Sequence, residues 1–209
     1  MHKQHQKPAD YNLNKIAYVI GNGTSRRNIP LISLVDQGTT YGCNAIYREF
    51  SPDYLIAVDV KMVIEINKSG YQHDNEVWTN PNKSYNNYVG FNYFNPSKGW
   101  SSGPTALNLA SDHENKTIYI LGFDFVGIDN LINNMYADTP NYKKSTDKAT
   151  YHSNWLKQTV AVINRNPEIK YIRVVDEQIP FVPTEFRKLN NLSHITVEKF
   201  NEIHNIEQI

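Results

Sequence analysis

Short apolar segments rich in β-branched residues recur along the chain, and polar or glycine-containing stretches separate them. Runs of this length and composition predict buried β-strands. The segments expected to form strands are Ile16–Ile20, Thr39–Cys43, Tyr54–Val58, Val89–Phe94, Thr117–Leu121 and Tyr171–Val175.

Segments with helical spacing of apolar residues lie between several of these strands. They are Asn28–Val35, Val60–Asn67, Gly103–Ser111 and Tyr151–Arg165. Strands that alternate with helices predict an α/β, Rossmann-like domain with a mostly parallel sheet and helices on both faces. After Pro180 we expect a small helix, a short strand around His194–Val197 and a terminal helix, packed at the sheet edge.

The domain organisation follows from this pattern and from the polar segments. Residues 1–14 are predicted to be a flexible N-terminal arm, and residues 15–209 a single domain. The stretch from 127 to 150 is polar, rich in Asn, Lys and Tyr, and has little periodicity. A loop of this length within a compact domain is typical of a lid or functional insertion, so we expect a lid-like loop there.

Charge and cysteine content narrow the classes of partner. Lys+Arg and Asp+Glu are both 21, so no overall basic field indicates a nucleic-acid or membrane surface. The single cysteine, Cys43, excludes an internal disulfide and fits a reducing compartment. The chain has no apolar run of membrane-spanning length and its N-terminus is polar rather than signal-like, so a cytoplasmic location is expected.

Small and polar residues follow the ends of several predicted strands. In parallel sheets, ligands bind outside the carboxyl ends of the strands, near the point where strand order reverses. The residues at these ends are Gly21, Asn22, Gly23, Asn44, Asp59, Ser102, Gly103 and Asp124. Their convergence on one sheet edge predicts a ligand site.

The first loop, Gly21-Asn22-Gly23, allows two interpretations. Its backbone amides could cradle a diphosphate or ribose, with side-chain hydrogen bonds from Asn22 and Ser25, or the glycines could serve a tight turn. Likewise, Arg26 and Arg27 either neutralise phosphates or are solvated.

The later strand ends carry similar alternatives. Ser102-Gly103 opens a helix, where a serine either caps the helix or helps its N-terminus to hold an anion. Asn44 is a helix cap or an amide that contacts a base or sugar. Asp59 and Asp124 either bond nearby backbone amides or hold a ribose hydroxyl or metal, and for Asp124 the structural role is favoured.

Chemistry also requires a group that can accept a proton. His152 lies at the start of a predicted helix, directly after the lid-like loop, and is a candidate general base, although a histidine there is often only a surface residue. Tyr136 and Tyr142 in the loop could donate hydrogen bonds to a departing phosphate or could simply anchor the loop.

The order of these motifs resembles the bacterial sialyltransferases of glycosyltransferase family 42 over roughly residues 15–175. The matching motifs are Gly21-Asn22-Gly23, Cys43-Asn44 with Tyr47, Ser102-Gly103, the stretch Ile118–Phe125 and His152-Ser153. The sequence departs from the family at Val126, where the family has a tyrosine, and at Asp59, where it has an asparagine.

The resemblance implies a metal-independent, inverting transferase without a cofactor that binds a cytidine-monophosphate sugar and a glycan or other hydroxyl acceptor. By this analogy Asn22, Asn44, Ser102 and Gly103 contact the donor, and His152 is the base.

A second resemblance keeps other functions open. Pro52-Asp53-Tyr54 and Val58-Asp59 after a glycine-rich loop are similar to pterin diphosphokinase-like proteins, which implies Mg-ATP. The chain also resembles short phage-encoded proteins, which would place it in the host cytoplasm. A non-catalytic nucleotide-binding or virion-associated protein is therefore a further alternative, and self-association is left open.

Overall fold

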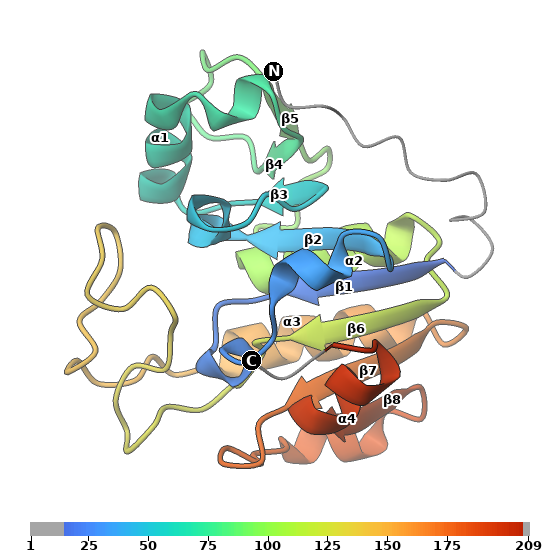
Figure 1. Ribbon diagram of the computed structural model, residues 1–209. Helices are drawn as coiled ribbons and strands as arrows, with labels where there is room; N and C mark the ends of the chain where they lie inside the picture. The colour runs from blue at the N-terminus through green and yellow to red at the C-terminus, as the bar shows by residue number, and fades with distance from the viewer. Residues whose placement is uncertain (1–14, 207–209) are drawn as a thin grey trace.

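The computed structural model describes residues 15–206, and the expected N-terminal arm, residues 1–14, lies outside the described residues. Eight parallel strands form one sheet with the order β5-β4-β3-β2-β1-β6-β7-β8 (Figure 1). The strands are β1 (Ile16–Ile20), β2 (Thr39–Cys43), β3 (Tyr54–Ile56), β4 (Val77–Thr79), β5 (Phe91–Tyr93), β6 (Thr117–Leu121), β7 (Lys170–Val175) and β8 (Leu192–Thr196). The predicted α/β, Rossmann-like fold is confirmed, and the sheet of the described residues is parallel throughout.

Four α-helices accompany the sheet within the described part of the chain. They are α1 (Val60–Ser69), α2 (Ser102–Asp112), α3 (Ser153–Arg165) and α4 (Val197–Ile203). No helix within residues 15–206 combines the length and the apolar character that crossing a membrane requires.

Alternating side chains of β1 explain why both faces of the sheet are covered. Ala17 and Val19 are buried in a cluster with apolar residues of α2 and α3. Tyr18 and Ile20 point to the other face, where they are buried with residues of α1 and α4. In Figure 1, α2 and α3 accordingly lie behind the sheet and α4 lies in front of it.

The predictions of individual elements differ from the structure in several places. Strands β3 and β5 are shorter than the predicted Tyr54–Val58 and Val89–Phe94. The short strand β4 was not predicted, because three residues are too few to show a period. The segment Asn28–Val35 forms only a short 3₁₀ helix, Leu31–Leu34, instead of an α-helix. The carboxyl-terminal strand is β8, at the sheet edge as expected, although it begins and ends earlier than His194–Val197.

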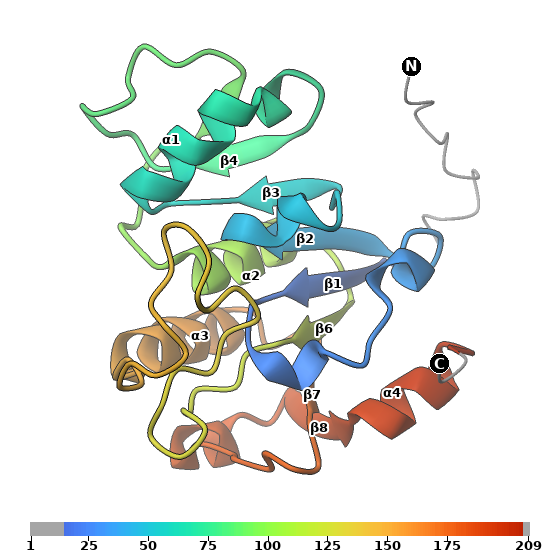
Figure 2. The ribbon, with the colours of Figure 1, turned by 60° about the vertical axis from the view of Figure 1, so that its left-hand side comes forward.

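Strand order reverses beside β1. From β1 the chain moves outward through β2 to β5, then returns to place β6 on the other side of β1. The parallel register pairs Ile20 with Leu121, so the loops that follow β1 and β6 begin side by side. The segment from 127 to 150, yellow to orange in Figures 1 and 2, projects beyond the arrowheads of these strands.

Candidate functional site

A cavity of about 500 Å³ opens at the carboxyl ends of the strands, at the point where strand order reverses. This is where ligands bind in open parallel sheets. The predicted site residues that line it are Gly21, Asn22, Gly23, Asn44, Asp59, Ser102, Gly103, Tyr142 and His152. Ser25 and Tyr136, also predicted, are buried behind its wall.

The glycines of the first loop serve the approach of two strand ends. The Gly21 amide donates to the carbonyl of Leu121 at 2.8 Å, and the Gly23 amide donates to the carbonyl of Gly122 at 2.9 Å. A Cβ atom at Gly23 would lie 2.4 Å from Oδ2 of Asp124 and 2.8 Å from the Gly122 oxygen. The tight-turn interpretation therefore describes these two glycines, and their amides are not directed at a phosphate.

The Asp124 carboxylate holds this loop from the end of β6. Its Oδ2 accepts hydrogen bonds from the Ser25 amide at 3.1 Å and from Nδ2 of Asn133 at 2.9 Å. The Ser25 hydroxyl donates to Oδ1 of the same carboxylate. The structural role expected for Asp124 is present, and Ser25 belongs to this support rather than to the cavity surface.

Arg26 is neither solvated nor directed into the cavity. It is 3% exposed, and its Nε donates to the Gly21 carbonyl at 2.8 Å. Its Nη2 donates to Oε1 of Glu49 at 2.9 Å and to the Tyr136 hydroxyl at 3.0 Å. Because the Tyr136 hydroxyl also donates to Glu49, these three side chains tie the 127–150 segment to the loops after β1 and β2.

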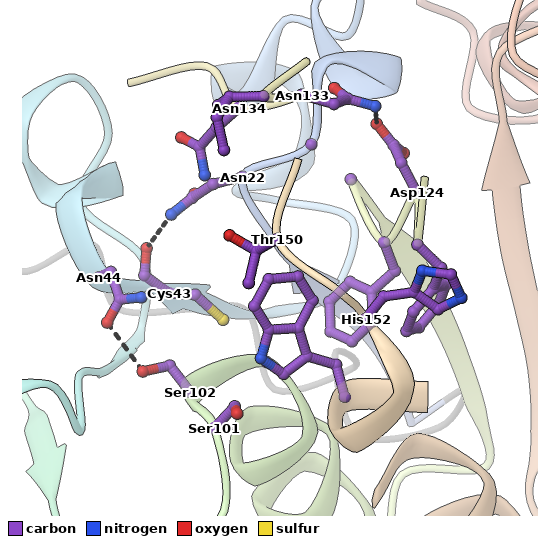
Figure 3. A pocket seen from close by; sticks show the side chains of 18 of the residues that line it. Asn22, Cys43, Asn44, Ser101, Ser102, Asp124, Asn133, Asn134, Thr150 and His152 are labelled. Atoms are coloured by element: carbon purple, nitrogen blue, oxygen red, sulfur yellow. Dashed lines mark hydrogen bonds between the residues drawn. The ribbon is translucent and has the colours of Figure 1, made fainter. Parts of the chain in front are cut away.

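Asn22 and Tyr142 join across the top of the cavity. Nδ2 of Asn22 donates to the carbonyl of Cys43 at 3.1 Å (Figure 3). It also donates to the Tyr142 hydroxyl at 3.3 Å. The Ala45 amide donates to the same hydroxyl at 3.3 Å. Burial raises the Tyr142 pKa to about 12, so the phenol stays protonated. With both acceptor positions of its oxygen occupied, the hydroxyl has its proton left to donate.

Asn22, Asn44 and Ser102 form one side of the cavity, the binding wall. Ser102 and Asn44 lie at the end of this wall away from Asn22. The Ser102 hydroxyl donates to Oδ1 of Asn44 at 2.8 Å and accepts from the Val58 amide at 3.1 Å (Figure 3). Asn44 has a φ of 53°, a left-handed conformation that asparagine tolerates better than most residues. Ser102 therefore connects the ends of β2 and β3 to the first turn of α2.

The N-terminus of α2 is at the cavity. Residues 101–104 line it, and no side chain caps the helix through Ser101. The partial positive charge of a helix N-terminus favours an anionic group there. A Cβ atom at Gly103 would lie 3.0 Å from Cζ of Phe123, so glycine lets α2 approach the loop after β6.

Asp59 keeps its carboxylate at the cavity. It precedes α1 in the capping position, but its side chain makes no capping hydrogen bond. Although the residue as a whole is exposed, partial loss of water around its carboxylate raises its pKa. Both features leave the Asp59 carboxyl group available to a ligand.

His152 stands on the other side of the cavity from Asn44 and Ser102 (Figure 3). Aromatic rings surround its imidazole, with centroid distances of 5.5 Å to Tyr151, 5.9 Å to Phe181 and 6.4 Å to Phe125. The imidazole is partly exposed at the cavity surface, as a proton acceptor for a bound hydroxyl would need to be.

Other lining residues were not predicted from the sequence. They include Asn133, Asn134, Lys143, Thr150 and Trp155. Trp155 carried a usable signal, because it lies three residues after His152 and so shares its helix face. The polar residues of the 127–150 segment carried no such signal. The segment has no period from which to infer which side chains point toward the cavity.

The carboxylates of the cavity offer little to a metal ion. Asp59 and Asp124 line it, and both oxygens of Asp124 already accept hydrogen bonds. Within residues 15–206, no group of three or more His, Cys, Asp or Glu side chains is placed to hold a metal ion.

No family model, curated protein or solved structure matches this chain. The function of the site is therefore argued from its own chemistry.

Proposed function

We propose that the protein is a glycosyltransferase that binds a nucleotide sugar in this cavity and transfers the sugar to a hydroxyl acceptor with inversion. The observation that carries the proposal is that Asn22, Asn44 and the N-terminus of α2 share one cavity with His152 on its other side. Hydrogen-bonding amides and a helix N-terminus suit a nucleotide, and an imidazole suits the activation of an acceptor hydroxyl.

The charge of the cavity disfavours a triphosphate more strongly than a donor with a single phosphate. Its ionised side chains are Asp59, Asp124 and Lys143, which together cannot offset a triphosphate without added cations. Its uncharged polar surface includes the amides of Asn22, Asn44 and Asn134. The side chains of Asn133 and Asn141 also line it, but their amide groups are bonded to Asp124 and Glu65. Amides of this kind form hydrogen bonds to sugar hydroxyls and base edges, so a cytidine-monophosphate sugar is the donor that we propose.

His152 is the proposed general base. Its imidazole accepts the proton of the acceptor hydroxyl while the hydroxyl oxygen forms a bond to the anomeric carbon of the donor sugar. The bond from that carbon to the phosphate oxygen breaks, and its electron pair leaves with the nucleoside monophosphate.

Two alternatives use the same cavity. A Mg-ATP-dependent diphosphokinase needs carboxylates for the metal, and Asp59 is the lining carboxylate without a hydrogen-bonded partner among the described residues. A non-catalytic nucleotide-binding protein needs only the binding wall, with Asn22, Asn44 and Ser102, and no general base. The first receives less support from the cavity's charge, and the second differs from our proposal only in lacking turnover.

A thermal-unfolding screen tests the proposal. The protein is heated with nucleotides and nucleotide sugars, each with magnesium or with EDTA. A ligand at 100 times its dissociation constant stabilises the native state by about 2.7 kcal/mol. We expect a cytidine-monophosphate sugar to stabilise the protein equally in EDTA. Stabilisation by ATP in magnesium alone would favour the diphosphokinase, and stabilisation without sugar transfer would favour the binding protein.

A further inference from the structure

We infer that Lys143 binds the phosphate of the nucleotide and stabilises the charge that it gains when the sugar leaves. This inference rests on the proposed function and adds a residue to it. Lys143 is the one lysine or arginine among the described residues that line the cavity. A nucleotide sugar brings a negative phosphate into that cavity, where a cation is needed to offset it.

Arg26 and Arg48 already have partners, and Arg27 is exposed but does not line the cavity. The guanidinium of Arg26 is bonded to Gly21, Glu49 and Tyr136 behind the wall. Arg48 donates to both carboxylate oxygens of Glu65, at 2.8 Å from Nε and 2.7 Å from Nη2. Either arginine would have to break an ion pair to reach a phosphate.

Lys143 makes no such ion pair, and its ammonium has donors left. Its Nζ donates to Oγ1 of Thr150 at 3.1 Å, and the residue is exposed. An ammonium carries three N–H donors, so the bond to Thr150 leaves the others for a ligand. Among the described residues, no carboxylate forms an ion pair with it.

Thr150, the hydrogen-bond partner of this ammonium, lies between the two sides of the cavity. Figure 3 shows the Thr150 side chain between Asn22 on one side and His152 on the other, with its hydroxyl directed toward Asn22. The Lys143 ammonium is within hydrogen-bonding distance of that hydroxyl and Lys143 lines the cavity, so the ammonium is close to the region between the binding wall and the base. A phosphate linking a bound nucleoside to a sugar near His152 would occupy this region.

The role differs from simple attraction because the charge changes during the reaction. In the bound donor the phosphate diester carries one negative charge, and after the sugar–oxygen bond breaks the monophosphate carries two. A cation at the phosphate therefore interacts more strongly with the product-like transition state than with the donor. Lys143 should affect both nucleotide affinity and turnover.

The test compares Lys143→Met with Lys144→Met, a matched variant at an exposed lysine that does not line the cavity. Binding of cytidine and of cytidine 5′-monophosphate is measured for the wild type and both variants by calorimetry. We expect Lys143→Met to weaken monophosphate binding by roughly 10- to 100-fold and to leave cytidine binding unchanged. Lys144→Met should leave both affinities unchanged, and Lys143→Arg should keep most of the monophosphate affinity.

Each other outcome has a defined meaning. Equal monophosphate affinity in Lys143→Met and Lys144→Met, with the wild type binding, overturns the role of Lys143 and leaves the proposed function in place. Equal weakening of cytidine and monophosphate by Lys143→Met also overturns it, because the loss would not concern the phosphate. Failure of the wild type to bind either compound overturns the cytidine-monophosphate donor, and with it this inference.

Discussion

The segment from 127 to 150 contains two parts that are held in different ways. The inner part, residues 133–142, is bonded to the body of the domain. The Met135 amide donates to the carbonyl of Asn22 at 2.8 Å, and Tyr136 and Tyr142 bond to the loops after β1 and β2. The hydrogen bonds of the outer part, residues 143–150, run within the segment itself, for example from the Ala149 amide to the Asn130 carbonyl at 2.8 Å.

A single arginine adds to this difference. Arg48 donates to Oγ1 of Thr139 at 2.8 Å and to the carbonyl of Pro140 at 3.0 Å. Its partner Glu65, on α1, accepts from Nδ2 of Asn141 at 2.6 Å. The inner part is therefore bonded both to η4, which is the 3₁₀ helix Asn44–Arg48, and to α1.

The two parts differ in which of their residues shape the site and which are available to a ligand. Polar groups of the inner part have protein partners, so they form a wall of fixed geometry. In the outer part, the side chains of Lys143 and Thr150 form a hydrogen bond to each other, and His152 lies two residues after Thr150. We expect any lid movement to occur in the outer part, because its opening would break no bond to the body of the domain.

The largest effect is the loss of turnover expected from His152→Ala, a variant of the residue that lies just after the outer part. Removal of a general base typically lowers turnover by about 10²–10⁴-fold. Because the imidazole is partly exposed and the proposed donor contacts lie on the other wall, donor affinity should change little. Steady-state kinetics with a cytidine-monophosphate sugar would measure both quantities.

The control for this variant is Asn154→Ala, which changes an exposed side chain that does not line the cavity. Its turnover should stay close to that of the wild type. Equal turnover in His152→Ala and the wild type would show that His152 is not the base. No proton acceptor would then be assigned beside the outer part.

A large loss of stability is expected on the fixed side, from Gly23→Ala. The added Cβ would lie 2.4 Å from Oδ2 of Asp124, the oxygen that also holds Asn133 of the inner part. Crowding of this kind typically costs about 1–3 kcal/mol. Urea unfolding should show a lower midpoint with an unchanged slope.

The matched variant is Gly103→Ala, where the nearest atom to the new Cβ is Cζ of Phe123 at 3.0 Å. A ring edge can move more easily than a hydrogen-bonded carboxylate and backbone. Gly103→Ala should therefore lose less stability than Gly23→Ala. If Gly23→Ala were as stable as the wild type, the close contact between the loops after β1 and β6 would not support the wall.

The smallest effect is expected from Asp59→Asn, at a carboxylate that has no capping bond. Because partial burial raises the Asp59 pKa above its ordinary 3.8, the native state binds more protons than the unfolded state between the two values. Stability of the wild type therefore falls as pH rises through that window. Asparagine removes this effect, so the variant should be slightly more stable at pH 7 and equal to the wild type below the ordinary pKa.

Unfolding curves from pH 3 to pH 7 would measure this difference between Asp59→Asn and the wild type. A gap that widens as the pH falls, or a variant that is less stable at neutral pH, would contradict the assignment. It would mean that the carboxylate has a favourable partner in the native state.

Local patterns predicted much of the fold. β1, β2 and β6 begin and end where their apolar runs do, because a buried strand needs a continuous apolar segment. The helices α2 and α3 begin within two residues of their predicted starts for a similar reason, since each follows its own helical period. β4 could not be predicted, because its place in the sheet depends on pairing with β3 and β5.

The site was predictable in its position and less so in its contents. Asn22, Asn44 and Ser102 were found because they follow strands or open a helix, and in a parallel sheet such positions meet at one edge. Ser25 and Tyr136 also looked like surface groups, but their hydroxyls bond to Asp124 and Glu49 behind the wall.

The positions of the strand ends, and with them the position of the cavity, follow from local sequence, because apolar runs and their periods are local properties. Which polar groups are already hydrogen-bonded depends instead on the packing of distant parts of the chain. Ser25 meets Asp124 across 99 positions of the chain, and Arg26 meets Tyr136 across 110. Hydrogen bonds between such distant groups depend on the packing of whole elements, so no local pattern separates Arg26, which is paired, from Lys143, which is available to a ligand.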